Sequence, residues 1–216
     1  MSVTIPDINR DSANAFKNSE SFRYVRTKRA IDLVAIALAL PLAIFIAAVT
    51  AIAIKLESSG NVFFWQKRVG MDGEVFNMLK FRSMTSDSEK LGSQFAQSND
   101  MRVTRVGKFI RKFRVDEIPQ LWNVLKGEMS IIGPRPEQES FVNEFNKNIP
   151  NYSLRHMVKP GITGLAQTEQ GYVADAEATI TKLEYDLYYI KNMSLLTDAQ
   201  ITLKTIYTIM TGFGAR

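Results

Sequence analysis

The longest feature of the hydrophobic pattern is an uncharged run from Leu33 to Ile54, which follows a basic stretch from Arg23 to Arg29. At about 1.5 Å of rise per residue, a helix over this run is long enough to cross the hydrocarbon core of a bilayer. A secretory signal peptide fits poorly, because the run is too long and no clean cleavage site follows it. A buried helix of a soluble protein fits poorly too, because the run is uniformly apolar. The pattern therefore predicts a membrane helix over residues 23–55.

Basic residues flank both ends of this helix: Arg23, Arg26, Lys28 and Arg29 before it, and Lys55, Lys67 and Arg68 after it. The positive-inside rule places both flanks on the cytoplasmic side, which a single span cannot satisfy. Pro41 lies inside the run, removes one helix hydrogen bond and favours a kink. A re-entrant helix that enters the membrane, bends near Pro41 and returns satisfies both observations, and a spanning helix is the alternative. Asp32 at the apolar boundary needs a partner such as Lys28 or Arg29.

The pattern on either side of the membrane helix predicts a tail and a domain. Residues 1–22 are polar and mixed in charge, which predicts a disordered tail. Residues 56–216 are long enough for one compact domain. Within them, residues 86–100 are polar and weakly periodic, which is typical of a loop or a loose helix.

A β-hairpin is predicted at the start of this domain. Residues 62–65 and 75–81 have the composition of strands, and glycine-containing turns lie at 58–61 and 70–73. If the second strand continues to Arg82, Lys80 and Arg82 share one face. Two cations on one face can hold a diphosphate, and a solvated edge strand is the structural alternative.

The rest of the domain has helical periodicity. Residues 103–115 form a basic amphipathic pattern, suited either to an anionic membrane surface or to ordinary core packing with a solvated basic face. Residues 141–154, 174–190 and 199–211 also predict helices, with Leu183, Leu187 and Ile190 on one apolar face. The predicted fold class is α+β: a re-entrant membrane helix followed by a small mixed domain with a short β-hairpin or sheet and several amphipathic, membrane-surface helices.

Composition narrows the chemistry. The net charge is +5 and the pI is about 9.4, which suits anionic partners such as acidic phospholipid or phosphorylated substrates. No nucleic-acid-binding motif is found, so no nucleic-acid partner is expected. Cysteine is absent and His156 is the single histidine, which excludes thiolate and histidine-based metal sites. Any metal is expected to be a hard ion held by oxygen ligands, with Mg²⁺ the first choice.

Candidate catalytic residues lie between Thr104 and Pro136. Asp116 and Glu117 follow a basic segment and precede a helical pattern in which Asp116 is a plausible N-cap, Pro119 fits the first turn and Gly127 fits the end. The helix dipole and the nearby cations favour ionised carboxylates, which suits a nucleophile or a metal ligand. A capping Asp with no further role is the structural alternative.

Cationic residues accompany the acidic pair. Arg111 precedes it, and Arg135 lies between two prolines that restrict its backbone and aim its guanidinium. A planar guanidinium recognises phosphate or carboxylate, although a Pro-Arg-Pro turn can also be purely structural. Arg155 and Lys159 lie beside a glycine-containing turn at 159–164, which is either a substrate contact or a structural loop.

Together these motifs resemble the bacterial sugar transferases that start polyprenol-linked glycan assembly, the monotopic phosphoglycosyl transferases. The resemblance extends from Lys28 to the C-terminus, and the pairing of DE with GPRP at this spacing is its most specific part. One departure is that Leu40 precedes Pro41, whereas the family has Ser-Pro about one turn further on. The matching segments are KRAID (28–32), FFWQKRVG (63–70), KFRSM (80–84), RKFRVDEIPQLWNVLKGEMSIIGPRP (111–136), LRHMVKPGITGLAQ (154–167) and EYDLYYIKNMSL (184–195).

The resemblance implies transfer of a sugar 1-phosphate from a UDP-sugar to a polyprenyl phosphate such as undecaprenyl phosphate, with release of UMP. It implies that Asp116 is the nucleophile of a ping-pong reaction through a phosphosugar-aspartyl intermediate, and that the domain lies on the cytoplasmic face of the bacterial inner membrane. Glu117 is assigned to magnesium or to proton handling, so Mg²⁺ is expected at Asp116 and Glu117. The residues expected to bind substrate are Lys80, Arg82, Arg111, Arg135, Arg155 and Lys159.

Larger relatives carry further N-terminal helices and another domain, so the resemblance implies the minimal catalytic form, and it leaves open whether the chain forms a homodimer. Two other functions compete with the transferase. A membrane-anchored protein that binds lipid or a partner would explain the apolar run and the basic charge. A UDP-sugar hydrolase would use water as the acceptor and release UMP without polyprenyl phosphate.

Overall fold

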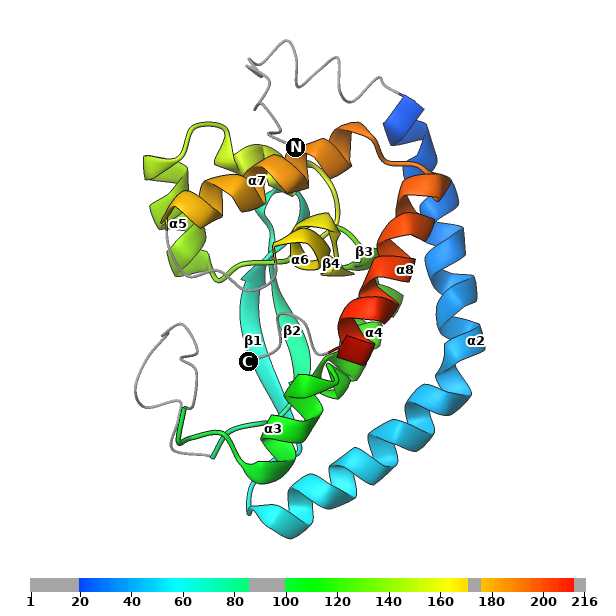
Figure 1. The fold of residues 1–216 in the computed structure, drawn as a ribbon, viewed down its shortest axis with the longest axis vertical. Helices are drawn as coiled ribbons and strands as arrows, with labels where there is room; N and C mark the ends of the chain where they lie inside the picture. The colour runs from blue at the N-terminus through cyan, green and yellow to red at the C-terminus, as the bar shows by residue number, and fades with distance from the viewer. Residues whose placement is uncertain (1–19, 86–99, 171–175, 212–216) are drawn as a thin grey trace.

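The computed structural model describes residues 20–85, 100–170 and 176–211 (Figure 1). The predicted disordered tail and the predicted loop over 86–100 lie outside these ranges, except for their ends. The described elements are α2 (Glu20–Glu57), β1 (Phe63–Val69), η1 (Met71–Gly73), β2 (Val75–Phe81), α3 (Arg105–Lys112), η3 (Val115–Gln120), α4 (Leu121–Lys126), β3 (Ser130–Ile132), α5 (Glu139–Asn148), η4 (Tyr152–Met157), β4 (Gly161–Thr163), α6 (Leu165–Glu169), α7 (Ala176–Lys191) and α8 (Leu195–Thr211), where η marks a 3₁₀ segment.

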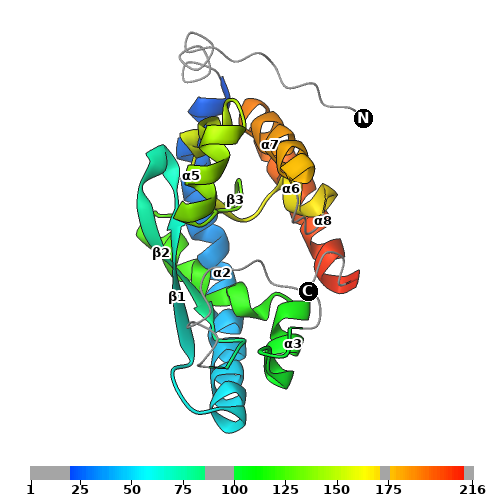
Figure 2. The same ribbon diagram turned by 90° about the vertical axis from the view of Figure 1, so that its left-hand side faces the viewer.

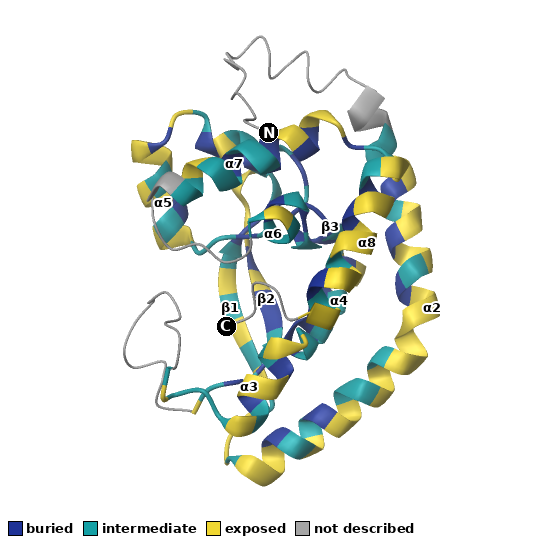
Figure 3. Ribbon diagram, viewed as in Figure 1, coloured by how far each residue is buried: buried dark blue, intermediate teal, exposed yellow. Residues whose placement is uncertain are grey.

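The predicted membrane helix is α2, which extends beyond both predicted boundaries and contains Pro41. It is long and apolar enough to cross a membrane, and it bends along its length (Figure 1). Residues near both of its ends are buried against the domain, among them Asp32 and Ile36 near the start and Ile54 near the end. Exposed apolar side chains predominate along its middle (Figure 3).

The predicted hairpin is confirmed, and its first strand is longer than expected. β1 and β2 pair antiparallel from Phe63 opposite Phe81 to Val69 opposite Val75. The composition of residues 66–68 is polar, which concealed the second half of β1, although exposed and less exposed positions alternate along the whole strand. The turn between the strands contains Asp72 with a φ of 55°, a left-handed conformation that Asp tolerates.

A second, parallel pairing joins the segment before Arg135 to the turn at 159–164. β3 and β4 pair with Ser130 opposite Gly161 and Ile132 opposite Thr163. The backbones approach so closely here that a Cβ on Gly161 would lie 2.1 Å from the amide nitrogen of Gly133. Glycine at position 161 is therefore required for this contact.

The helices α6, α7 and α8 lie on the other side of the molecule from the hairpin (Figure 2). On α7, Leu183, Leu187 and Ile190 are buried in the main hydrophobic cluster, as predicted. On α8, Ile201 is buried in the same cluster, whereas Ile206 is exposed. The described chain is thus α+β with one long apolar helix and small two-stranded sheets, which confirms the α+β part of the predicted class.

Candidate active site

Asp116 and Glu117 lie in the 3₁₀ segment η3, which runs directly into α4. The prediction that Asp116 caps an α-helix is wrong, because the residue before the 3₁₀ segment is Arg114, in a left-handed conformation with φ 54°. In a 3₁₀ segment, side chains repeat every three residues, so adjacent carboxylates point in different directions. Gly127 ends α4 with φ 85°, as predicted.

Glu117 is 6% exposed and paired with two cations from distant parts of the chain. Its Oε1 accepts a hydrogen bond from Arg135 Nη2 at 2.6 Å, and Lys80 Nζ lies 3.6 Å from the same oxygen. Burial by itself raises the pKa of Glu117, but the charges of Arg135 and Lys80 outweigh it and lower that pKa to about 2. Glu117 is therefore a permanent anion that holds two cations in place.

Asp116 is 8% exposed and meets different surroundings. Within residues 20–85, 100–170 and 176–211, no group donates a hydrogen bond to its carboxylate. Burial raises the pKa of Asp116 to about 6, against the opposing charges of Lys80, Arg111 and Arg135. Near pH 7 it is a mostly ionised, unusually basic carboxylate without a hydrogen-bond donor, which suits a nucleophile.

Arg111 reaches the acidic pair from α3, whose N-terminus Thr104 caps through its hydroxyl. The Arg111 Nε donates to Ser83 Oγ at 2.8 Å, so the end of β2 fixes the guanidinium. Within the predicted amphipathic pattern of residues 103–115, Phe109 is 62% exposed and contacts Phe113. Ile110 and Gly107 are the buried positions, so α3 packs through a narrower face than the periodicity predicted.

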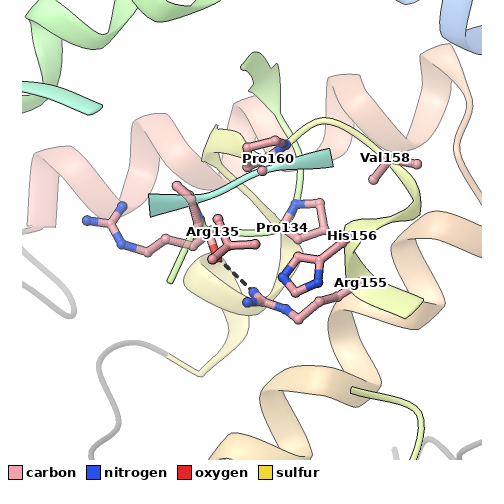
Figure 4. A pocket seen from close by; sticks show the side chains of 9 residues that line it. Pro134, Arg135, Arg155, His156, Val158 and Pro160 are labelled. Atoms are coloured by element: carbon pink, nitrogen blue, oxygen red, sulfur yellow. Dashed lines mark hydrogen bonds between the residues drawn. The ribbon is translucent and has the colours of Figure 1, made fainter. Parts of the chain in front are cut away.

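Arg135 is held through its backbone. Its carbonyl oxygen accepts a hydrogen bond from Arg155 Nη2 at 2.8 Å, and its side chain extends away from His156 toward Glu117 (Figure 4). A small pocket beside this backbone is lined by residues that include His156, Val158 and Pro160. The Pro-Arg-Pro segment thus presents its guanidinium to the acidic pair.

The structure does not bring Arg155 to the acidic pair as a substrate ligand. Arg155 is 2% exposed, and its guanidinium donates to Asp186 Oδ2 at 2.7 Å and to the Tyr152 hydroxyl at 3.1 Å. A buried guanidinium with these partners cannot reach a soluble donor in this conformation. Arg155 therefore supports the backbone of Arg135. Asp186, the partner of Arg155 on α7, was not identified from the sequence, because the periodicity of α7 marks only its apolar face.

Two further predicted cations lie elsewhere. Arg82 directly follows the end of β2, and its guanidinium donates to the carbonyl oxygens of Ser58 and Ser59 beyond the end of α2, so these carbonyls and not the acidic pair hold it. Lys159 Nζ lies near Gly127 at the end of α4, on the side of Arg29. Of the six predicted substrate cations, Lys80, Arg111 and Arg135 surround the acidic pair.

The acidic pair can hold a metal ion only together with other ligands. The described ranges contain no group of three or more His, Asp or Glu side chains that could hold one. Mg²⁺ is commonly bound by one or two carboxylates and completed by substrate phosphates and water. Asp116, which receives no hydrogen bond from the described residues, and Glu117 fit a magnesium site of that kind.

Comparison with known proteins gives consistent matches. Residues 23–212 match the family described as Bacterial sugar transferase. The chain is 57% identical over 193 residues to UDP-N-acetylgalactosamine-undecaprenyl-phosphate N-acetylgalactosaminephosphotransferase of Aeromonas hydrophila, covering 89% of this chain and 46% of that protein. It is 44% identical over 182 residues to UDP-glucose:undecaprenyl-phosphate glucose-1-phosphate transferase of Klebsiella pneumoniae, covering 83% of this chain and 39% of that protein.

The protein of the same name from Caulobacter vibrioides is 40% identical over 186 residues, which cover 85% of this chain and 70% of that protein. The chain thus spans less than half the length of the Aeromonas and Klebsiella proteins. The matched part includes the acidic pair and every cation described above.

Proposed function

Because this chain belongs to the bacterial sugar transferase family, we propose that it transfers a sugar 1-phosphate from a UDP-sugar to a membrane polyprenyl phosphate such as undecaprenyl phosphate, releasing UMP. One observation carries the proposal: Asp116 lies buried beside three cations that come from β2, α3 and the Pro-Arg-Pro segment. That arrangement suits a carboxylate that must attack a negatively charged diphosphate.

In the first step, Asp116 attacks the phosphorus that carries the sugar. A bond forms between the carboxylate oxygen and phosphorus, the bond from that phosphorus to the bridging oxygen breaks, and UMP leaves with the electron pair. In the second step, an oxygen of the polyprenyl phosphate attacks the phosphosugar-aspartyl phosphorus, giving the polyprenyl diphosphate sugar and freeing the Asp116 carboxylate. Two steps at one carboxylate allow a soluble and a lipid substrate to use the site in turn.

The cations reduce the repulsion between the nucleophile and the donor. Lys80, Arg111 and Arg135 are held by Glu117 and Ser83, so their charges are in place before substrate arrives. Mg²⁺ bound at Asp116 and Glu117 would supply further positive charge to the phosphate oxygens. We assign Glu117 to holding these cations and to sharing that metal ion.

The lipid substrate requires the site to lie at a membrane surface. Both ends of α2 pack against the same domain while its middle is exposed and apolar, which supports a re-entrant helix over a spanning one. The basic flanks at both ends support a cytoplasmic location of the domain at the inner membrane. The relatives' names specify different sugars, so the family does not select the donor.

The first test is UMP release by the purified protein in lipid nanodiscs with Mg²⁺, for a panel of UDP-sugars with and without undecaprenyl phosphate. Release from one sugar that is completed by the lipid acceptor and lost with EDTA is the expected result. Release that does not depend on the acceptor would indicate a hydrolase. Binding to acidic lipid without any UMP release would indicate a membrane-anchored binding protein.

The nucleophile is tested by Asp116→Asn, which retains size but removes the charge that attacks phosphorus. We expect no capture of labelled phosphosugar on the protein and a loss of UMP release of at least about a thousandfold, the scale of losing a covalent nucleophile. Glu117→Gln is the adjacent comparison and should retain covalent capture at a lower rate. Full capture by the Asp116→Asn variant would refute the assignment.

A further inference from the structure

The outer edge of β2 is held by a side chain instead of a strand. In the described part of the chain, β2 pairs only with β1. On its other edge, the Leu79 amide donates to Asn123 Oδ1 at 3.0 Å, and Asn123 Nδ2 donates to the Asn77 carbonyl at 2.8 Å. One side-chain amide thus bonds the carbonyl of one residue and the N–H two residues later, as the N–H and C=O of one residue in a parallel neighbouring strand would.

The Asn123 amide has one orientation that satisfies all its partners. The second hydrogen on Nδ2 is donated to Glu128 Oε2 at 2.7 Å. The backbone carbonyl oxygen of Asn123 accepts a hydrogen bond from the backbone N–H of Glu128 at 3.0 Å. Both N–H bonds of the side chain therefore face acceptors and the oxygen faces a donor. Asn123 is 0% exposed and its neighbours Val124 and Met129 are core residues, so a lost hydrogen bond here would leave a buried polar group unpaired.

This amide joins the two segments that carry Lys80 and Glu117. Lys80 follows Leu79 directly on β2, and Glu117 lies in η3, which continues into the helix that carries Asn123. The contact that results is the 3.6 Å approach of Lys80 Nζ to Glu117 Oε1. The backbone of Lys80 pairs with Phe64 of β1 and its ammonium reaches Glu117, while the Leu79 amide is bonded to Asn123 on the opposite edge of β2. Movement of β2 away from α4 would therefore displace Lys80.

We propose that Asn123 is a positioning residue that acts through Lys80, with Glu128 fixing the orientation of the Asn123 amide. The inference rests on the proposed function, in which Lys80 contacts the donor diphosphate. Asn123 holds β2 against α4 and so sets the place of the Lys80 ammonium beside Glu117.

Two variants break the amide contacts, and a third retains them. Asn123→Asp keeps the size and one acceptor for the Leu79 amide, but it removes both N–H donors and sets a carboxylate beside Glu128. Glu128→Ala removes the acceptor that orients the amide, together with the solvent-accessible pair of Glu128 with Lys126, so it tests the same idea if Asn123→Asp fails to fold. Glu128→Gln retains an acceptor oxygen for Asn123 Nδ2 and is the matched control.

The experiment is a double-mutant cycle with Lys80→Met, read as affinity for UDP by calorimetry in nanodiscs, with thermal unfolding recorded for each protein. We expect Asn123→Asp and Glu128→Ala to weaken UDP binding about tenfold, and Glu128→Gln less than about twofold. In the Lys80→Met background, Asn123→Asp and Glu128→Ala should each weaken binding by less than about twofold further, because their effect passes through Lys80.

If Asn123→Asp and Glu128→Ala weaken UDP binding as strongly in the Lys80→Met protein as in the wild type, the proposal is overturned. A merely structural residue would weaken binding independently of Lys80 in this way. Unchanged UDP affinity in Glu128→Ala, or in a folded Asn123→Asp protein, would overturn it as well. A wild-type protein that neither binds UDP nor releases UMP would instead refute the proposed function and this inference with it.

Discussion

Asp116 and Glu117 are adjacent in the chain, yet their carboxylates meet different surroundings. Glu117 contacts Arg135 and Lys80, whereas Asp116 is buried without a hydrogen-bond donor among the described residues. Burial raises the pKa of Asp116 to about 6, while the two cations lower that of Glu117 to about 2. The charge of Glu117 further raises the pKa of Asp116, which widens the difference between the two carboxylates. It separates a candidate nucleophile from a residue that holds cations.

His156 makes the stability of the protein sensitive to acid. Burial, with the charge of Arg155 beside it, lowers the pKa of His156 to about 4, and its buried Nε2 has no hydrogen-bond partner in the described part of the chain. Between pH 6.5 and 4 the unfolded chain binds more protons at this position than the folded one, so stability falls as the pH falls through that window. From pH 7 to pH 5 we expect His156 to contribute a loss on the order of 2 kcal/mol.

His156→Phe tests this expectation, because phenylalanine has a similar shape and does not titrate. Unfolding of the variant and the wild type in detergent, by denaturant at pH 7 and at pH 5, gives the measurement. The wild type should lose more stability than the variant over that interval. Equal losses in the two proteins would show that His156 is not buried in its neutral form.

At the scale of elements, the Pro-Arg-Pro segment depends on α7. Arg155 in η4 donates to Asp186 on α7 and to the backbone of Arg135, so one buried guanidinium connects three parts of the chain. Removal of one partner from a buried ion pair leaves an uncompensated charge, which costs about 3–5 kcal/mol. The orientation of Arg135 therefore rests on a contact that lies away from the acidic pair.

We expect Arg155→Met to lower the free energy of unfolding by about 3–5 kcal/mol, because Asp186 is left charged and buried. Arg155→Met combined with Asp186→Leu should recover part of that loss, since neither charge remains. Lys204→Met is the matched control: its pair with Glu169 is exposed, and its loss should stay below about 1 kcal/mol. Denaturant unfolding in detergent measures all three. A variant that keeps its stability but loses donor affinity would restore Arg155 as a substrate ligand.

At the scale of the whole molecule, α2 is a helix long and apolar enough to cross a membrane and is also a part of the fold. Near its start, Asp32 accepts from the Ser130 hydroxyl and Lys28 pairs with Asp198, and near its end Ile54 packs with Phe81. These contacts bind both halves of one bent helix to one domain. A domain on one side of the bilayer then requires both helix ends on that side.

Cysteine labelling tests this topology, and the absence of native cysteine makes each label specific. Thr27→Cys and Ser59→Cys, both at exposed positions near the ends of α2, should react with a membrane-impermeant maleimide added on the same side of sealed vesicles. Leu42→Cys, in the apolar middle, should stay unreactive in lipid and react in denaturant. Labelling of the two end positions from opposite sides would establish a spanning helix.

Several features of the protein follow from short-range properties of the chain. The uncharged run from Leu33 to Ile54 predicted the long apolar helix α2, because an apolar segment long enough to cross a bilayer has few other stable conformations. Gly127 readily adopts a left-handed backbone conformation, and α4 ends there as predicted. The strand-like composition of residues 75–81 and the turn residues before them predicted the bounds of β2. The acidic pair and the Pro-Arg-Pro segment were recognised from residue types at close spacing, which requires no knowledge of distant contacts.

Only the tertiary structure decided which charges meet. Glu117 and its partners Lys80 and Arg135 are far apart in sequence, as are Arg155 and Asp186, and no local pattern encodes such a pairing. The pKa values depend on burial, which arises only when distant segments pack together. For the same reason the sequence placed Arg82 and Arg155 among the substrate ligands and gave no sign of Asn123, because the partners that hold these side chains lie in parts of the chain that folding alone brings to them.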